Sequence, residues 1–473
     1  MGRRGSLQLA LQLAVLGVVM FVFVTPASAI PAFARKYSLR CTSCHEAWPV
    51  LNDFGRTFRD NGYQLRLGKD DTVTAEPGYW PVAVHVTPAY KYSKTTNQAT
   101  DTVPGVAGGV VPGDLAPRDI GSGSVADASM DLLMAGVLTK NISFLVVPTG
   151  FASDGNVHLE SYWAYFTRIF KNSDWFNFRI GQHEIDLPAS SHRTLTYVSN
   201  YLMYAYHPGV PAAIINADKR FTGNPNFLAY GSAQLSAYDM GANQRGFEFT
   251  GHSPQDTTRY SVSVFSAHDS LGSSNGLSSP SFAGHFQKFV RFDKGPVSEA
   301  EVGVWGVVAN SPTEFVTLGG TPLPNTGHNL QSSSRYGAEA NVWIGPTVAP
   351  LHLDLVYGHG VDKKGLVISS DRDGVWNGGF LEAIWVPPVE ALHWAVFGRY
   401  DVIRNQKQPV IAAPSNYNDQ DQISLGLTYT IAYSIRDEVA FRAEVASLKN
   451  KGVGFAGLDQ RTDTLTLGVD FVY

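Results

Sequence analysis

The residues best suited to chemistry in this chain form one short motif, Cys41-Thr42-Ser43-Cys44-His45. The spacing C-x-x-C-H is the attachment pattern of a c-type haem. In such a site the two thiols bond to the haem vinyl groups, and the adjacent histidine binds the iron as its proximal ligand. The motif uses both of the 2 cysteines in the chain. The sequence therefore predicts one covalently attached haem c, with Cys41, Cys44 and His45 as its binding residues.

Two other kinds of site use closely spaced cysteines. A thioredoxin-like redox pair needs no histidine after the second cysteine and belongs in a βαβ context, which this sequence lacks. A structural zinc site needs a second Cys or His pair at suitable spacing, and the chain has no third cysteine. Both alternatives explain the motif less completely than haem attachment does.

Residues 1–29 have the features of an export signal. Two arginines precede an apolar run over residues 9–24, and small residues then form an A-x-A cleavage site. We expect the mature protein to begin at Ile30, with an uncleaved membrane anchor as the alternative. Covalent haem attachment takes place outside the cytoplasm, so the export signal and the motif agree.

The composition narrows the class of protein. Aromatic residues make up 12% of the chain, charged residues only 16%, and there are 46 glycines. After residue 29 no apolar run approaches the roughly 20 residues of a transmembrane helix. Cleavage of the signal removes two arginines and lowers the net charge from −5 to −7, which indicates no nucleic-acid partner. This profile is typical of an outer-membrane β-barrel or of a large soluble β protein.

The motif lies in a segment, residues 30–79, that we expect to be a short α-helical haem segment. Apolar residues recur after the motif at helical spacing. They are Trp48, Leu51, Phe54 and Phe58. The spacing predicts a helix from near His45 to about Asp60, ended by Asn61-Gly62. Its apolar stripe would cover the haem.

This segment lacks a second iron ligand. His45 is its only histidine, and it contains no methionine. Either the iron is five-coordinate or the following chain supplies the sixth ligand. His85 is the first choice, because a short stretch of chain joins it to the haem segment. In the expected strand Val84 and Val86 face lipid, so His85 faces the lumen near the periplasmic mouth. The same argument places other histidines inside that mouth: His252, His352 and His393.

Residues 80–473 are predicted to form a transmembrane antiparallel β-barrel. At the C-terminus, Leu465 and Leu467 alternate with Thr466 and Gly468, the apolar-out, polar-in pattern of barrel strands. Similar segments recur and give about sixteen strands. They lie near 81–93, 127–139, 142–153, 156–170, 175–186, 243–253, 257–268, 282–293, 298–311, 334–345, 351–361, 377–387, 392–404, 421–433, 436–449 and 461–473.

The links between these strands alternate in length. Short links such as 140–141, 253–256 and 294–297 alternate with long ones such as 94–126 and 187–242. Short periplasmic turns and longer outer loops are the rule in outer-membrane barrels. Both barrel ends and the haem segment are thereby expected on the periplasmic side.

The N-terminal region resembles a known family over residues 31–63. The matching stretches are Pro31-Ala32-Phe33-Ala34-Arg35, Cys41 to His45, Pro49-x-Leu51-x-x-Phe54-Gly55-Arg56-x-Phe58 and Asn61-Gly62-Tyr63. Together they resemble the fused outer-membrane cytochrome–porins, whose best-known members are the iron-oxidising cytochromes of iron-oxidising bacteria. The stretch from Arg59 to Tyr63 is also similar to a broader set of cytochrome–porins with unsettled substrates.

The resemblance implies one N-terminal haem c, held in or at the lumen of a barrel of about sixteen strands in the bacterial outer membrane. It also implies electron transfer from extracellular Fe(II), or another donor, to a periplasmic c-type cytochrome or other carrier. Two alternatives come from other classes of protein. One is a diffusion porin whose haem segment acts as a plug or gate, and the other is a soluble periplasmic β protein.

Overall fold

The computed structural model of the 473-residue chain describes most of it. The described residues are 32–65, 70–75, 81–98, 118–126, 130–150, 157–170, 173–197, 199–206, 240–266, 280–312, 330–345, 350–363, 372–387, 394–407, 418–433, 438–452 and 458–473. The predicted export signal and its cleavage site lie outside these residues and stay predictions.

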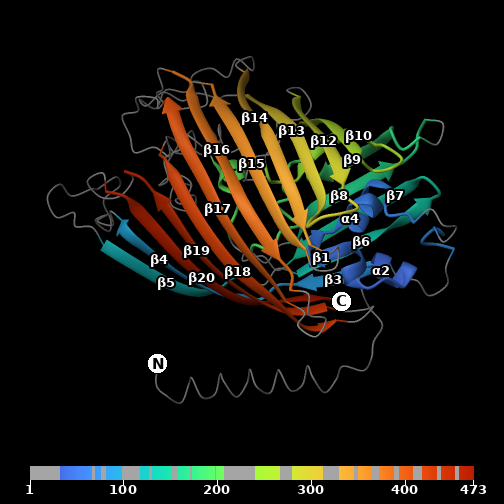
Figure 1. Ribbon diagram of the computed structural model, residues 1–473, viewed down its shortest axis with the longest axis horizontal. Coiled ribbons are helices and arrows are strands. Elements are labelled where there is room, and N and C mark those ends of the chain that lie inside the picture. The colour runs from blue at the N-terminus through green and yellow to red at the C-terminus, as the bar shows by residue number, and fades with distance from the viewer. Residues whose placement is uncertain are drawn as a thin grey trace.

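Antiparallel strands form one closed barrel (Figure 1). Its strands are β3 (Val82–Val86), β4 (Ala89–Gln98), β5 (Arg118–Ala126), β6 (Met130–Thr139), β7 (Ile142–Gly150), β8 (His158–Phe166), β9 (Asn177–His183), β10 (Gln244–His252), β11 (Thr258–Ser266), β12 (Ser281–Arg291), β13 (Val297–Pro312), β14 (Leu330–Ile344), β15 (Leu351–Asp362), β16 (Gly374–Trp385), β17 (Trp394–Lys407), β18 (Gln420–Tyr433), β19 (Glu438–Asn450) and β20 (Gln460–Val472).

Two pairs of these segments are halves of longer strands. Both β3 and β4 pair with β20, while β6 pairs with β3 and β5 pairs with β4. Pro88, which has no N–H to donate, lies between β3 and β4. Counted this way, the described segments make the sixteen strands of the barrel. The predicted all-β barrel of about sixteen antiparallel strands is confirmed.

The outer face of the barrel wall is apolar. Its inner face is largely polar at the end of the barrel that holds the N-terminal segment, here called the barrel mouth. On β13, Val302 and Val304 are 57% and 58% exposed, whereas Glu301 and Trp305 are each 4% exposed. This alternation suits lipid outside the barrel and a packed lumen inside it. A soluble β protein would expose these apolar side chains to water, so the alternation argues against that alternative. Among the described residues no helix has the length and apolar character to cross a membrane.

Among the described residues, five short elements precede the barrel: α2 (Ala32–Tyr37), α3 (Cys41–Cys44), β1 (His45–Ala47), β2 (Val50–Leu51) and α4 (Asp53–Asp60). The predicted helix from His45 to Asp60 is therefore wrong in its first half. His45 begins an extended strand that pairs with β2, and the helix begins only after Asn52. The Asn52 side chain accepts a hydrogen bond from Gly55 N at 2.9 Å and caps α4.

A second segment also lies inside the barrel. Residues 184–206, here called the inward segment, follow β9 and include α5 (Leu202–Ala205). Its Tyr201, Met203 and Tyr206 are buried against Trp376 and Phe380 of the inner wall, within one apolar cluster. We predicted this stretch as part of a long outer loop over 187–242. The other prediction for a long loop, 94–126, also missed β5.

Candidate functional site

The three residues of the haem motif line one cavity of about 260 Å³, here called the motif cavity. Cys41 and Cys44 stand at the two ends of α3, and His45 follows at the start of β1. The other lining residues are mostly apolar: Phe33, Leu39, Trp48, Pro49, Leu51, Gly55, Phe58, Tyr63, Leu133, Ala135 and Leu145, with Arg40, Arg59 and Arg193 as the cations. An apolar cavity beside two cysteines and a histidine is what an attached porphyrin needs.

His45 is held in one tautomer. Its Nδ1 lies 3.0 Å from the carbonyl oxygen of Pro49. A carbonyl can only accept, so Nδ1 carries the proton and donates it. The lone pair of the neutral ring is then on Nε2, the arrangement found in ligating histidines whose other nitrogen is fixed by a carbonyl.

The protein environment keeps all three motif residues uncharged. Burial raises the pKa of Cys41 to about 12, with the charge of Glu438 adding to the effect, and burial raises the pKa of Cys44 to about 11. Burial lowers the pKa of His45 to about 4. A thioether is also uncharged, and a ligating imidazole must be neutral, so this environment suits haem attachment.

Gly55 lies on the face of α4 that packs against Cys44, where a side chain would not fit. A Cβ at this position would lie 2.0 Å from the carbonyl oxygen of Cys44 and 3.1 Å from Leu51 Cδ2. Backbone cannot yield to a contact this short. The glycine is therefore required for α4 to pack directly against the C-terminal end of the motif.

Stacked aromatic rings connect the motif cavity to the barrel wall. Phe33 stacks on Tyr63 with ring centroids 4.4 Å apart, and Tyr63 stacks on Trp163 of β8 at 5.8 Å. Phe33 and Tyr63 line the motif cavity, while Trp163 lines the cavity beside it. Offset aromatic pairs of this kind add about 0.5–1.5 kcal/mol each beyond the area they bury.

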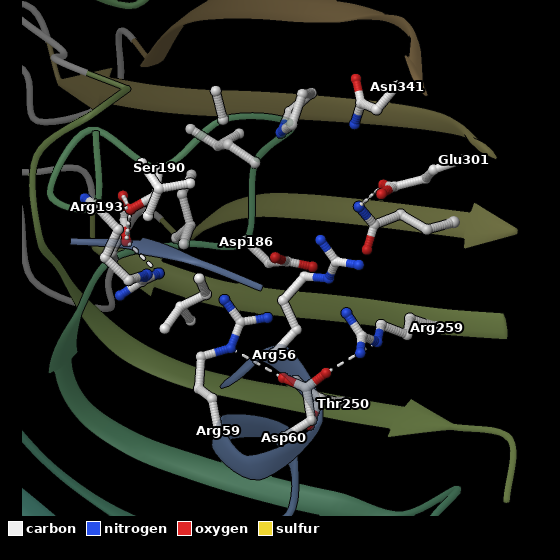
Figure 2. Close-up of a pocket in the computed structure, with 18 of the residues that line it drawn as sticks. Arg56, Arg59, Asp60, Asp186, Ser190, Arg193, Thr250, Arg259, Glu301 and Asn341 are labelled. Atoms are coloured by element: carbon white, nitrogen blue, oxygen red, sulfur yellow. Dashed lines mark hydrogen bonds and ion pairs between the residues drawn. The ribbon is translucent and has the colours of Figure 1, made fainter. Parts of the chain in front are cut away.

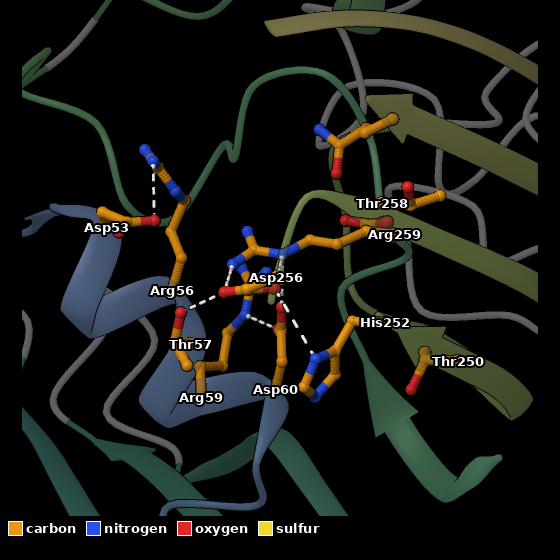
Figure 3. Close-up of polar contacts among 12 residues, drawn as sticks. Asp53, Arg56, Thr57, Arg59, Asp60, Thr250, His252, Asp256, Thr258 and Arg259 are labelled. Atoms are coloured by element: carbon orange, nitrogen blue, oxygen red, sulfur yellow. Dashed lines mark hydrogen bonds and ion pairs between the residues drawn. The ribbon is translucent and has the colours of Figure 1, made fainter. Parts of the chain in front are cut away.

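Ion pairs fix α4 inside the mouth of the barrel (Figure 3). Arg259 of β11 donates to Asp256 from Nη2 at 2.6 Å, and its Nε lies 3.0 Å from Asp60. Thr57 donates to the same Asp256. Burial acts to raise the pKa of Asp256, but the hydrogen bond and charge of Arg259 prevail and lower it to about 2. Asp256 lies in the short turn between β10 and β11, so the helix docks at the short-turn end.

Glu46 connects β1, the strand that begins at His45, to strands β14 and β15 of the barrel wall. Its Oε1 accepts from Trp343 Nε1 at 2.6 Å, and its Oε2 lies 3.3 Å from His352 Nδ1. His352 stacks on Trp343 with ring centroids 4.2 Å apart. Two barrel strands, β14 and β15, thus hold the residue next to His45. Nothing in the motif itself indicated this role for Glu46.

The inward segment supplies one residue to the motif cavity, Arg193. Its Nη2 donates to Glu184 at 2.8 Å, and Glu184 also accepts from Ser190 Oγ and Ser191 N, each at 2.8 Å. Figure 2 shows Arg193, Ser190 and Arg59 among the residues that line a second cavity, here called the central cavity. Sequence reasoning missed Arg193, because a lone arginine in a long link carries no recognisable pattern.

His85 faces the lumen as predicted, but it lines the neighbouring cavity of about 680 Å³ and not the motif cavity. Its Nδ1 is 3.2 Å from Asp131, and its Nε2 is 2.9 Å from Asp470. Both ring nitrogens are thereby engaged by carboxylates. Of the other predicted candidates, His352 contacts Glu46, His252 Nδ1 lies 3.0 Å from the carbonyl oxygen of Ser253, and His393 lies outside the described residues.

Two thiols, a pre-set imidazole and an apolar wall make the motif cavity a good fit for a covalently attached haem. The adjoining 680 Å³ cavity, which shares Trp48, Arg59 and Arg193 with it, gives the polar edge of such a group a place to extend. Elsewhere the described residues contain no group of three or more His, Cys, Asp or Glu that could hold a metal ion.

Comparisons with known proteins return barrels. No family model matches the sequence, and no curated protein matches it. Similar solved structures include an anion-selective porin from Comamonas acidovorans (13% identity, TM-score 0.47), the outer membrane channel DcaP of Acinetobacter baumannii (10%, 0.47) and OprB of Pseudomonas putida (10%, 0.47). The matches cover 83%, 83% and 82% of this chain and 99%, 97% and 94% of those chains. At such identities the likeness is one of fold.

Proposed function

We propose that this chain is a monohaem outer-membrane cytochrome built into a porin-type barrel, and that it transfers electrons between an extracellular donor and a periplasmic carrier. The observation that carries the proposal is the motif cavity, in which Cys41, Cys44 and His45 meet apolar walls inside the barrel mouth. The barrel lies in outer-membrane lipid with its short turns toward the periplasm, so the haem segment faces that side of the lumen.

Each motif residue has a defined role in this proposal. Cys41 and Cys44 anchor the haem through their sulfurs, and His45 presents Nε2 to the iron while Pro49 holds Nδ1. When bound, the haem supplies reversible one-electron chemistry. Phe33, Phe58 and the barrel residues exclude water from the group, and burial of a haem is one of the means by which a protein tunes its potential.

The packing of the inward segment supports electron transfer over free diffusion of solutes. Met203 is 1% exposed and Tyr204 is 3% exposed, and both belong to an apolar cluster that includes Trp376 and Phe265 of the inner wall. Leu202 N donates to Asp401 on β17 at 3.1 Å, which ties the segment to the wall. A porin that admits polar solutes has a water-filled lumen instead.

Fe(II) is the first donor to test, on the strength of the family resemblance. Acidic residues near the long-loop end are paired with cations, as Asp362 is with Arg335 and Asp421 with Arg404. Asp371, which lies in the long link between β15 and β16, is outside the described residues. The donor is therefore left to experiment, and the acceptor is expected to be a periplasmic c-type cytochrome or another small carrier.

The test is to express the chain with the machinery for c-type haem attachment and to isolate the outer membrane. We expect a heat-modifiable band that keeps its haem after denaturation, and a Cys41→Ala/Cys44→Ala variant with the same heat-modifiable barrel and no covalent haem. Oxidised protein should then be reduced on addition of Fe(II) or of another donor in a panel. A folded wild-type barrel without covalent haem would contradict the proposal.

The diffusion porin makes the opposite prediction. Haem would be present but would stay oxidised with every donor, and channels in planar bilayers would conduct ions at a porin's level. Conductance and haem reduction measured on the same preparation separate the two functions.

A further inference from the structure

We infer that Arg193 of the inward segment, together with Arg59 of α4, binds the haem propionates and raises the haem reduction potential. The inference rests on the proposed function, since it concerns how the chain holds the haem. It begins from the position of both arginines where three cavities meet. Arg59 and Arg193 line the motif cavity, the 680 Å³ cavity and the central cavity of about 180 Å³.

The distribution of polarity orients a haem in this space. The porphyrin is apolar over both faces, whereas its two propionates are carboxylates at one edge. A carboxylate placed among Phe33, Leu133 and Leu145 would lack any partner for its charge, and such burial is costly. At the junction with the polar cavities the same carboxylates meet guanidinium groups, which bind carboxylates with two parallel hydrogen bonds. The propionate edge therefore points toward Arg59 and Arg193.

Arg193 is prepared for this role by its own segment. Its side chain is 35% exposed, although Glu184 holds one end of it at 2.8 Å. A guanidinium has five N–H donors, so one ion pair leaves capacity for a second carboxylate. Glu184 in turn is held by Ser190 and Ser191. This network lies within residues 184–193 and sets the arginine beside the motif cavity.

A cation beside the haem changes its redox equilibrium. Oxidised haem iron carries one more positive charge than reduced iron, so a fixed positive charge nearby disfavours the oxidised form and raises the potential. Removal of the Arg193 charge should therefore shift the equilibrium toward the oxidised form. We expect about a tenfold change, which equals about 59 mV for a one-electron couple.

The test is a potentiometric titration of purified, haem-loaded wild type, Arg193→Gln and Arg193→Lys, with Arg404→Gln as the matched control. Arg404 is paired with Asp421 in the outer half of the barrel and does not line the motif cavity. We expect a lower midpoint in Arg193→Gln, a smaller change in Arg193→Lys and none in Arg404→Gln. The propionate bending band in the resonance Raman spectrum should also shift in Arg193→Gln alone.

The outcomes are distinguishable. Wild-type protein without covalent haem refutes the proposed function and this inference together. Loaded wild type and Arg193→Gln with equal midpoints and equal propionate bands refute this inference and leave the proposed function intact. If Arg193→Gln forms a heat-modifiable barrel but holds little haem, restored loading in Arg193→Lys supports the inference, whereas failure of Lys to restore it indicates a purely structural role and refutes it.

Discussion

Two of the described segments enter the lumen of this barrel, and they differ in how much apolar packing holds them. The N-terminal segment is tied to the wall by ion pairs and hydrogen bonds, such as Arg56 to Glu299 at 2.6 Å and Glu46 to Trp343 at 2.6 Å. The inward segment adds a large apolar contact around Met203 and Tyr204 to its own polar contacts with the wall, such as Ser199 N to Glu444 at 3.0 Å and Arg399 to the carbonyl oxygen of Asn200 at 3.0 Å. The first segment brings the motif residues into the barrel mouth, and the second contributes one arginine to their cavity and packs against the inner wall beyond it.

This difference in packing indicates that the two segments have different tasks. Polar contacts are directional, so they suit a segment whose His45 must be oriented to a fraction of an ångström. Apolar packing is less directional but excludes water efficiently. We therefore expect substitutions in the N-terminal segment to affect the haem, and substitutions in the inward segment other than at Arg193 to affect closure of the lumen.

The largest effect on haem content is expected at Gly55. A Gly55→Ala methyl group would overlap the carbonyl oxygen of Cys44 at 2.0 Å, so α4 and the motif cannot keep their packing. Overpacking of this kind typically costs about 1–3 kcal/mol, and we expect about a tenfold loss of haem per barrel. Gly284→Ala is the control, because its nearest neighbour would be 3.7 Å away. Haem content by haemochrome assay, normalised to the heat-modifiable band, is the measurement, and equal loading in the two variants would show that the motif tolerates the methyl group.

The second largest effect is expected on ion conductance, when the packing of the inward segment is weakened. Met203 is 1% exposed, and truncation by Met203→Ala would leave a void in the apolar cluster at a cost of about 2–5 kcal/mol. We expect haem content to stay near wild type while ion conductance in planar bilayers rises and thermal stability falls. Leu458→Ala removes a side chain that is 46% exposed and serves as the control. A loss of haem with unchanged conductance would reverse the assignment of tasks to the two segments.

The sequence predicted some of this arrangement well and some of it poorly. Alternation of apolar and polar residues, as in Leu465 and Thr466, is a local pattern repeated along the chain, and it was enough to predict the closed barrel. The motif predicted a haem site from three residues, and the structure places these three residues on one cavity, while the haem itself stays a prediction. Glu46 could not be predicted, since its partners Trp343 and His352 are brought to it only by the closure of the barrel. Arg193 could not be predicted, since a lone arginine in a long link carries no recognisable pattern. The helix start was misplaced because helical spacing of apolar residues outweighed Pro49 and the capping side chain of Asn52.

The smallest effect is expected at His85. The measurement decides whether β3 of the barrel supplies the sixth iron ligand. The sequence predicts His85 as the sixth iron ligand. Its two ring nitrogens contact Asp131 and Asp470 at 3.2 and 2.9 Å, so ligation would require breaking a contact with one of two carboxylates. We expect the optical and electron paramagnetic resonance spectra of oxidised His85→Ala to match those of wild type. His158→Ala, at the start of β8, is the control.

Loss of a low-spin signature in His85→Ala alone would restore His85 as the ligand and would mean that the haem extends into the 680 Å³ cavity far enough to displace a carboxylate. An unchanged spectrum would mean that the barrel contributes walls and charges to the site and no iron ligand from β3. Because the two results differ in the spin state of the iron, the measurement does not depend on knowing the electron donor.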